Sequence, residues 1–432
     1  MAGTMIRWLY TLALALVSPI LLWGLYRKKP NKPIFGERWK EHFGYTPDLD
    51  ERREGVIWLH AVSVGEVLAS KVLLERIQIL YPHKRILVTT TTSTGAEQVV
   101  NLEGNIVHRY MPIDFSWCIN RFLKIIQPDL FIIVETEIWP NTLHNVSKHN
   151  VPIVLINGRL SEKSEANYKK FRKLISPALN NLQMILTVHN DDKGRFNSLV
   201  SGLDKVKVTG SIKYDVSLDE RILVKGKALR SVLGLERKVW IAASTHQGED
   251  ELIIKAYNLA KKHAPELLLV IVPRHPERFN QVAKLVGESG LTISRRTDSN
   301  DAISEKVDVY LGDTMGEMMV LLAASDLVFM GGSLIGNKVG GHNFIEPALL
   351  SKPCLTGPSY FNFSDLANQL ISHNALSVVS SSEELASLVT SLFSDSRKMA
   401  SMGQHGYDIV QKNQGALQRT LNTIEQVISK SS

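Results

Sequence analysis

Short apolar runs alternate along the chain with stretches whose apolar residues recur at the spacing of an amphipathic helix. Each apolar run has the length of a buried strand, and most lead into a polar or glycine-rich loop and then a helical pattern. This order of strand, loop and helix predicts parallel α/β sheets. The predicted strands are residues 56–59, 85–89, 129–134, 151–156, 184–188 and 206–209, and then 239–243, 267–272, 307–311, 327–330 and 353–357.

The alternation is interrupted once, between two similar halves. Residues 216–238 are charged and helical in pattern and contain no strand-like run. We interpret them as the linker between an α/β domain over 33–215 and a second one over 239–432. The last amphipathic stretch, 415–428, could pack back on the first domain. Two Rossmann-like α/β domains that face a cleft describe the GT-B architecture.

An uncharged apolar stretch lies near the beginning of the chain. Trp8–Tyr26 carries no charge over 19 positions, close to the roughly 20 residues that span a bilayer as a helix. Aromatic residues near both ends and a basic cluster behind it are typical of membrane anchors, and the positive-inside rule keeps the following chain cytoplasmic. The aromatic residues are Trp8, Tyr10, Trp23 and Tyr26, and the basic ones are Arg27, Lys28, Lys29 and Lys32. We therefore expect residues 1–32 to be an anchor with a basic juxtamembrane segment.

Two other interpretations of this stretch exist. A monotopic insertion broken at Pro19 would place the helix on the membrane without crossing it, and that alternative stays open. A cleaved signal peptide is disfavoured, because no small-residue cleavage site precedes the basic cluster. Both remaining versions place the protein on a membrane.

Composition and charge fit a globular protein on a lipid surface. Hydrophobic residues make up 44% and charged residues 22% of the chain, and the net charge is +7. The segment 27–53 mixes aromatic and cationic residues beside the apolar span, which suits anionic phospholipids and disfavours nucleic acid as the partner. Cys118 and Cys354 are far apart and form no metal pattern, so a reducing compartment fits best.

The densest cluster of candidate chemistry lies in Asp326–Pro358. An apolar run there is followed by a glycine-rich loop and then by Asn343 and Glu346, which predict a helix beginning at Asn343. Free backbone amides at a helix start can bind an anion. Alternatively, Asn343 and Glu346 only form a capping box. Neither GxGxxG nor a Walker pattern is present, so a Rossmann dehydrogenase or P-loop enzyme is not indicated.

Carboxylates and one lysine follow strands of the first half. Glu66 in HAVSVGE lies at the start of a helix, where the helix dipole alone could also explain it. Glu135 and Glu137 leave a buried strand and need either a ligand or a basic partner. Lys213 in GSIKYD could face the cleft between the domains. The carboxyl ends of parallel strands are where ligands bind in such sheets.

Four loops of the second half have ligand-binding character and are expected at one edge of a sheet. Arg274 and Arg278 in PRHPERF suit a phosphate or a carboxylate. Loops that converge in this way would form a nucleotide-sized site. The four loops are 244–248, 273–275, 314–317 and 331–346.

Taken together, the motifs of this chain resemble those of the 3-deoxy-D-manno-octulosonic acid (Kdo) transferases of lipopolysaccharide synthesis, which are inverting glycosyltransferases of GT-B fold. They run in order from residue 58 to residue 348 and cover nearly the whole chain. The motifs are WLHAVSVGE, VTTTTSTG, VETEIWPN, NGRLSEKS, TGSIKYD, STHQGED, VPRHPERF, GDTMGEM and GGHNFIEPA.

The resemblance implies an activity and a set of site residues. The donor would be CMP-Kdo, bound by the C-terminal domain, and the acceptor a lipid A precursor, lipid IVA, bound by the N-terminal domain. Glu66 would be the general base, and Glu135 and Lys213 would support the transition state. The residues implied at the CMP site are Pro273, Arg274, His275, Met315, Gly316, Glu317, Asn343, Phe344, Ile345 and Glu346, with Glu346 accepting ribose hydroxyls.

The same resemblance places the enzyme at the inner membrane, with its catalytic domains on the cytoplasmic side. We expect no cofactor beyond the donor and no metal, because no Asp-x-Asp or histidine cluster stands out. Two alternatives remain: a membrane-anchored GT-B transferase that uses another nucleotide sugar, and a non-catalytic nucleotide-binding scaffold. An intact Glu66 beside a glycine argues against the scaffold.

Overall fold

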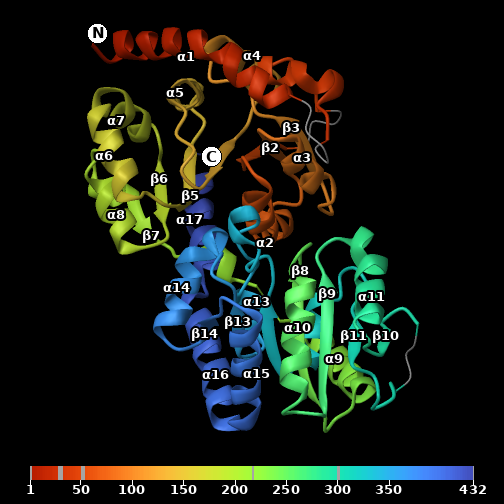
Figure 1. Cartoon of the computed structure of the whole chain (residues 1–432). Coiled ribbons are helices and arrows are strands. Elements are labelled where there is room, and N and C mark those ends of the chain that lie inside the picture. Colours follow the sequence, from red (N-terminus) through yellow and green to blue (C-terminus); the bar gives the residue numbers. More distant parts are fainter. Residues whose placement is uncertain (1, 28–32, 50–53, 217, 299–301, 432) are drawn as a thin grey trace. The chain divides into compact units, whose positions relative to one another are not determined.

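The protein consists of two compact units, each built around one parallel β-sheet (Figure 1). The computed structural model describes residues 2–27, 33–49, 54–216, 218–298 and 302–431. The first unit comprises Met1–Asp215 together with Asn413–Ser432, and the second comprises Val216–Lys412. Lys28, Lys29 and Lys32 of the expected basic cluster lie outside the described residues. The predicted α/β fold class of two Rossmann-like sheets is confirmed.

In the described part of the first unit, the sheet has the strand order β3-β2-β1-β4-β5-β6-β7, and every pair is parallel. The chain builds outward from β1 on one side and from β4 on the other, so a topological switch point lies between them. Ligands bind beyond the carboxyl ends of strands at such a point. The strands are β1 (Val56–His60), β2 (Arg85–Thr90), β3 (Ile106–Tyr110), β4 (Leu130–Val134), β5 (Ile153–Gly158), β6 (Met184–Thr187) and β7 (Val206–Val208).

Helices cover both faces of this sheet. Alternate residues of β1 therefore enter different cores: Trp58 packs with Phe122 and Phe131 on one face, and Leu59 packs with Ile132 on the other. Strands buried on both faces are continuously apolar, and this explains why they could be predicted from the sequence. The helices include α1 (Ala2–Tyr26), α2 (Val64–Leu80), α3 (Ser93–Val100), α4 (Ser116–Ile126), α5 (Pro140–Lys148), α6 (Glu162–Lys170), α7 (Arg172–Asn180), α8 (Asn190–Asn197) and α17 (Ala416–Ser431), with short 3-10 turns η1 (Gly36–Phe43) and η3 (Ile212–Tyr214).

The sheet of the second unit has the strand order β10-β11-β9-β8-β12-β13-β14, again with parallel pairs throughout the described residues. Its switch point lies between β8 and β12. The strands are β8 (Lys238–Thr245), β9 (Leu267–Pro273), β10 (Ile293–Arg295), β11 (Val309–Leu311), β12 (Leu327–Met330), β13 (Cys354–Thr356) and β14 (Leu376–Val378). The helices are α9 (Glu220–Leu233), α10 (Asp250–Lys261), α11 (Phe279–Glu288), α12 (Met318–Ala324), α13 (Ile345–Leu349), α14 (Ser364–Ser372), α15 (Ser382–Ser394) and α16 (Ser396–Asn413).

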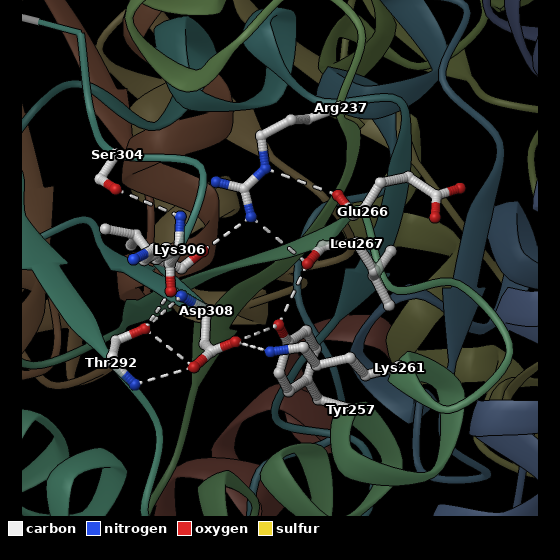
Figure 2. A network of polar contacts seen from close by, with 10 residues as sticks. Arg237, Tyr257, Lys261, Glu266, Leu267, Thr292, Ser304, Lys306 and Asp308 are labelled. Atoms are coloured by element: carbon white, nitrogen blue, oxygen red, sulfur yellow. Dashed lines mark hydrogen bonds and ion pairs between the residues drawn. The ribbon is translucent and has the colours of Figure 1, made fainter.

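A polar network joins the amino ends of the strands in this second sheet (Figure 2). Asp308, which is buried just before β11, accepts hydrogen bonds from Tyr257 and from both the backbone and the hydroxyl of Thr292, and it also pairs with Lys261. Arg237 donates to the carbonyl of Val307 over 2.7 Å. Because the strands are parallel, this edge is opposite the one where the ligand-type loops emerge.

One segment lies elsewhere than expected, whereas the last helix packs back on the first unit, as the sequence allowed. Residues 216–238, expected as a linker, contain α9, which packs on α12 through Gly226 and Ala323. An ion pair of 2.8 Å also joins Arg230 of α9 to Asp326, just before β12. Residues 216–238 therefore belong to the second unit. The last helix, α17, places Ile424 in the core of the first unit, so the second unit ends before it.

Among the described residues, α1 is the one helix long and apolar enough to cross a membrane, judged by length and composition. The apolar window covers Met5–Tyr26. Within the first unit α1 contacts α5 and α7. The expected apolar N-terminal helix is therefore present.

Candidate functional site

Glu66 is held at the start of α2 by the loop that leaves β1. Its carboxylate accepts the backbone N–H of Val62 at 2.8 Å and the hydroxyl of Ser63 at 2.9 Å. Ser63 is the N-cap of α2 and in return accepts the backbone N–H of Glu66. Burial raises the pKa of Glu66, against the lowering effect of these two hydrogen bonds. The result is an oriented, partly desolvated carboxylate with an elevated pKa.

Glu135 lies directly after β4, across the switch point from Glu66. Its φ of +60° is left-handed backbone, which a glutamate rarely adopts and which costs on the order of 1–3 kcal/mol. Its side chain forms a 2.9 Å ion pair with Lys213, and both side chains are about one-third exposed. Lys213 lies in η3, where Ser211 accepts its backbone N–H. The ion pair predicted as the alternative for this strand exit is thus present.

Glu137 is a third carboxylate of this cluster. Burial, followed by the negative charge of Glu66, raises its pKa to about 7, although Trp139 donates an indole N–H to it at 3.0 Å. Glu135 raises the same pKa, and Lys213 lowers that of Glu66. We call these four residues, Glu66, Glu135, Glu137 and Lys213, the carboxylate cluster. A pKa of about 7 leaves Glu137 partly protonated near neutral pH.

Asn157 lies beside the carboxylate cluster and was not predicted. It follows Ile156 of β5, which pairs with Val134 just before Glu135. Its φ is +54° and its residue surface is 1% exposed. Among the described residues, neither polar atom of its side chain has a hydrogen-bond partner. A buried side-chain amide without a hydrogen-bond partner is unusual. It marks the carboxyl edge of this sheet as a place for ligand contact.

The glycine-rich loop after β12 differs from its prediction. The backbone amides of Gly332, Ser333 and Leu334 donate to the carboxylate of Glu249 over 2.6–2.9 Å, and Glu249 is fully buried. The prediction of free amides is therefore wrong for these three groups, because an internal carboxylate already binds them.

The helix predicted to begin at Asn343 begins instead at Ile345. It is the short helix α13, which ends at Leu349. The side-chain oxygen of Asn343 accepts the N–H of Ile345 at 3.0 Å, and its amide nitrogen donates to Glu346 at 3.3 Å. The helix starts later because the side chain of Asn343 accepts the backbone N–H of Ile345, which is only two positions further along the chain. The capping box that was the alternative is therefore not formed, because Asn343 and Glu346 meet through their side chains and neither side chain bonds the backbone N–H of the other.

Three histidines and two arginines gather in the loops that follow β8, β9 and β12. The Nε2 atoms of His246 and His342 lie 2.9 Å apart, and the rings stack. His275 meets His246 edge-on at 5.3 Å between ring centroids. Burial, then the neighbouring positive groups, lowers the pKa of His246 and of His342 to about 4. We call His246, His275, His342, Arg274 and Arg278 the histidine–arginine cluster.

The two arginines of this cluster differ. Arg278 is buried and bonds both Asp250 and the carbonyl of Thr245. Arg274 is exposed, and its guanidinium has no ion pair or hydrogen bond among the described residues. It acts on Glu346, whose pKa burial raises and Arg274 lowers. Arg274 is thus available to an anionic ligand, whereas Arg278 supports the fold.

The other predicted residues of the CMP site have different surroundings. Pro273 ends β9, and Met315 is 66% exposed in the loop before α12. Phe344 and Ile345 are buried, so their side chains serve the core. Gly316 has a φ of +78°, which favours glycine.

Glu317 is already occupied within the second unit. It forms a 3.1 Å ion pair with Arg296 and accepts the hydroxyl of Thr314. Glu317 therefore has a protein partner. Arg274, His275 and Glu346, in contrast, lie near one another. No group of three or more histidine, cysteine, aspartate or glutamate side chains among the described residues is arranged to hold a metal ion.

The residues missed by sequence reasoning had recognisable surroundings. His246 and Glu249 lie in STHQGED and His342 in GGHNFIEPA, both motifs that the sequence analysis had singled out. Glu137 was recognised with Glu135 as a carboxylate at a strand exit, but no role was predicted for it. Asn157 had no sequence signal beyond following a predicted strand.

Comparison with known proteins assigns the chain to a family. Residues 37–216 match the family model described as 3-Deoxy-D-manno-octulosonic-acid transferase (kdotransferase). A 3-deoxy-D-manno-octulosonic acid transferase of Haemophilus influenzae is 37% identical over 98% of this chain and 99% of its own length. The transferase of the same name from Bordetella pertussis is 31% identical over 97% of this chain and 99% of its own.

Solved structures agree with the fold. The UDP-GlcNAc 2-epimerase of Neisseria meningitidis matches with a TM-score of 0.53 at 15% identity, over 86% of this chain and 99% of that one. At this identity the likeness concerns the fold alone, two parallel-sheet α/β domains of GT-B type. The sequence relatives settle the rest: this chain belongs to the 3-deoxy-D-manno-octulosonic acid transferase family.

Proposed function

We propose that this chain transfers Kdo from CMP-Kdo to a lipid A precursor, lipid IVA, with inversion at the anomeric carbon. As a member of its family it is a glycosyltransferase that transfers Kdo in lipopolysaccharide biosynthesis. The observation that carries the proposal is the 37% identity with the Haemophilus influenzae transferase over 98% of this chain. The carboxylate cluster at the first switch point supplies chemistry that fits it.

Glu66 is proposed as the general base. A sugar hydroxyl is a poor nucleophile, and a positioned base contributes about 10²- to 10⁴-fold. Glu66 would take the proton of the acceptor hydroxyl as the acceptor oxygen bonds to the anomeric carbon of Kdo. The bond from that carbon to the phosphate oxygen breaks, and CMP leaves with the electron pair. The raised pKa of Glu66 strengthens it as a base.

Glu135 and Lys213 are proposed to support the transition state. Their ion pair fixes a positive charge beside the carboxylate cluster. That charge lowers the pKa of Glu66, so it balances the raising effect of burial and keeps the base ionised in more molecules. The left-handed backbone of Glu135 is consistent with a residue retained for its side chain.

The CMP part of the donor is proposed to bind in the second unit. Arg274 and His275, after Pro273, would hold the phosphate, and Glu346 would accept ribose hydroxyls. Support comes from the unpaired guanidinium of Arg274 and its effect on Glu346. The remaining proposed positions are Met315, Gly316, Glu317, Asn343, Phe344 and Ile345, of which the buried Phe344 and Ile345 would act through the backbone.

The reaction is proposed to need no cofactor and no metal. Loss of transfer after treatment with EDTA, and its recovery with a divalent ion, would reject that part. The enzyme is also proposed to work on the cytoplasmic side of the inner membrane, among phospholipids. Its apolar α1 supports a location at a membrane.

The proposal is tested by transfer from CMP-Kdo to a tetraacyl lipid A precursor, with CMP release as the readout. Wild type should form product, and Glu66→Gln should lose at least about 10²-fold in kcat. Glu97→Gln, which changes an exposed glutamate of α3, is the matched control. Turnover with another nucleotide sugar but not with CMP-Kdo would favour the alternative transferase, and full activity of Glu66→Gln would remove the base.

A further inference from the structure

Helix α1 has its polar side chains on the side that faces the first unit and apolar side chains on the exposed side. From residue 5 onward, its polar residues up to Ser18 are all partly buried. On the exposed side, Trp8, Leu16, Ile20 and Trp23 have 66–74% of their surface accessible. A helix at a soluble protein surface has the opposite arrangement. The polar residues in question are Arg7, Tyr10, Thr11 and Ser18.

Polar contacts tie α1 to the first unit at both ends. Near its start, the Tyr10 hydroxyl donates to the carboxylate of Asp114 at 2.9 Å, and the Asn141 amide donates to the Thr11 hydroxyl at 2.9 Å. At its end, the Tyr26 hydroxyl lies 2.9 Å from Nδ1 of His42. Tyr10 and Tyr26 are separated by about 24 Å of helix. The whole apolar stretch therefore lies along the first unit (Figure 1).

Asp114 makes these contacts incompatible with a helix that crosses a bilayer. It is 2% exposed and belongs to a site in which Asn141 and Thr142 also donate to it. In a spanning helix, Tyr10 would enter the hydrocarbon, so either Asp114 would follow it or the hydrogen bond would break. A carboxylate in the hydrocarbon is costly, and a buried carboxylate deprived of a donor is destabilised.

We propose that α1 lies in the plane of the membrane interface. Its exposed apolar face enters the lipid, its polar face stays on the first unit, and the chain does not cross the bilayer. A helix of this kind buries its apolar face at the boundary between headgroups and acyl chains. Both of its ends then remain on the side of the membrane that holds the first unit.

Aromatic residues extend the same surface beyond α1. The Tyr26 hydroxyl donates to the carbonyl of Trp39, whose ring meets Phe43, and Phe43 stacks near Trp117. Trp39 and Trp117 are about half exposed. The guanidinium of Arg121 lies over the Trp117 ring at 5.5 Å. Tryptophan beside a cation is typical of the headgroup region of a bilayer.

Positive charge on the neighbouring helices favours an anionic lipid surface over a second copy of this chain. Helix α7 contacts α1, and the turn between α6 and α7 exposes Phe171 among basic residues. Two like-charged copies would repel each other there, whereas anionic headgroups are attracted. The exposed basic residues are Lys169, Lys170, Arg172 and Lys173.

The first test asks which side of the membrane holds the start of α1. The full chain with Gly3→Cys is placed in sealed vesicles and treated from outside with a membrane-impermeant maleimide. Ser201→Cys, an exposed position of the first unit, identifies vesicles with that unit outside, and both native cysteines are buried. Equal labelling at both positions is expected. Labelling of Gly3→Cys only after detergent opens the vesicles would show a spanning helix and overturn the proposal.

The second test measures depth at the middle of α1. An environment-sensitive fluorophore on Leu16→Cys should be quenched more by a lipid spin label near the headgroup than by one near the chain end. Ser18→Cys, on the face toward the first unit, is the matched control and should respond to neither. Stronger quenching of Leu16→Cys by the deep label would contradict an in-plane helix.

The third test identifies what covers the apolar face. The full chain should float with vesicles that contain anionic lipid and at least several-fold less with zwitterionic ones. Failure to float together with a concentration-dependent dimer would assign the face to a second copy and reject the proposal.

The inference rests on the proposed function only for the presence of a bilayer. None of these tests needs transfer activity, so their failure is distinguishable from failure of the enzyme assignment.

Discussion

Lys213 pairs with Glu135 over 2.9 Å although 78 residues separate them in sequence. The pair is made by two loops at the carboxyl edge of the first sheet, one after β4 and one after β7. It places a cation beside three carboxylates that would otherwise repel one another. The ion pair is therefore part of the electrostatics of Glu66 as well as of the local fold.

Replacing the cation should impair catalysis more than stability. We expect Lys213→Met to lower kcat by roughly 10²-fold, because the pKa of Glu66 rises further and a charge that supports the transition state is lost. The ion pair is partly exposed, so the cost in the free energy of unfolding should stay below about 1 kcal/mol. Lys207→Met, at an exposed position of β7, is the control. Equal kcat in the two variants would contradict a role for Lys213.

The backbone of Glu135 offers a separate test. Glu135→Gly should leave stability unchanged or raise it by up to about 1 kcal/mol, since glycine accepts a positive φ, yet it should abolish most transfer activity. Asn150→Gly, at a φ of +59°, is the matched control and should keep activity. Urea midpoints and kcat of both variants distinguish the two effects. A fully active Glu135→Gly enzyme would show that the side chain is dispensable.

The raised pKa of Glu137 predicts a pH-dependent stability difference. The folded pKa of about 7 lies above the ordinary value of 4.5, so the folded state favours the protonated form. Between those two values the unfolded chain releases the proton while the folded one retains it, and stability falls as pH rises. Glu137→Gln removes this penalty and keeps an acceptor for Trp139.

The gain from Glu137→Gln should be small near pH 4.5 and reach about 1–2 kcal/mol above pH 7, allowing for solvent screening. Urea unfolding at pH 5 and pH 8 measures it, with Glu97→Gln as the control. A difference from wild type that is the same at both pH values would show that Glu137 is not perturbed.

Replacing the two arginines of the histidine–arginine cluster should have different effects, one on CMP binding and the other on stability. Arg274→Ala should weaken CMP binding by at least about 10-fold without changing thermal stability, because its guanidinium has no partner among the described residues. Arg278→Ala leaves Asp250 buried without its cation and should cost about 3–5 kcal/mol. Calorimetric titration with CMP and thermal unfolding separate them. Loss of stability in Arg274→Ala would contradict its assignment as a ligand-binding residue.

Sequence reasoning predicted the strands that are buried on both faces and, among the described residues, missed three of the four strands at the sheet edges. β4 and β9 are continuously apolar, because helices cover both faces of each sheet. The missed strands are β3, β10 and β14, whose sequences IVHRY, ISR and LSV are short or polar and lie at sheet edges. Strands with one unpaired edge need no continuous apolar run.

Site residues were predictable where motif and strand exit coincided, as for Glu66 and Glu135. The hydrogen-bond and ion-pair partners of these residues were not predictable, because they depend on contacts between loops that are distant in sequence. Glu249 meets the loop after β12 from 83 residues away, so no local pattern announced that those amides were occupied. The same holds for the pairing of His246 with His342, which are 96 residues apart.

The return of α17 to the first unit has a consequence for biosynthesis. The carboxylate of Asp215 accepts the backbone N–H groups of Gly415 and Leu417 at 2.6 and 2.7 Å, so the second unit is inserted into the first between two adjacent points. On the ribosome, the second unit can fold as soon as its own residues emerge. The earlier-made first unit must wait for α17, and until then the apolar surface that α17 covers stays open to aggregation or to chaperones.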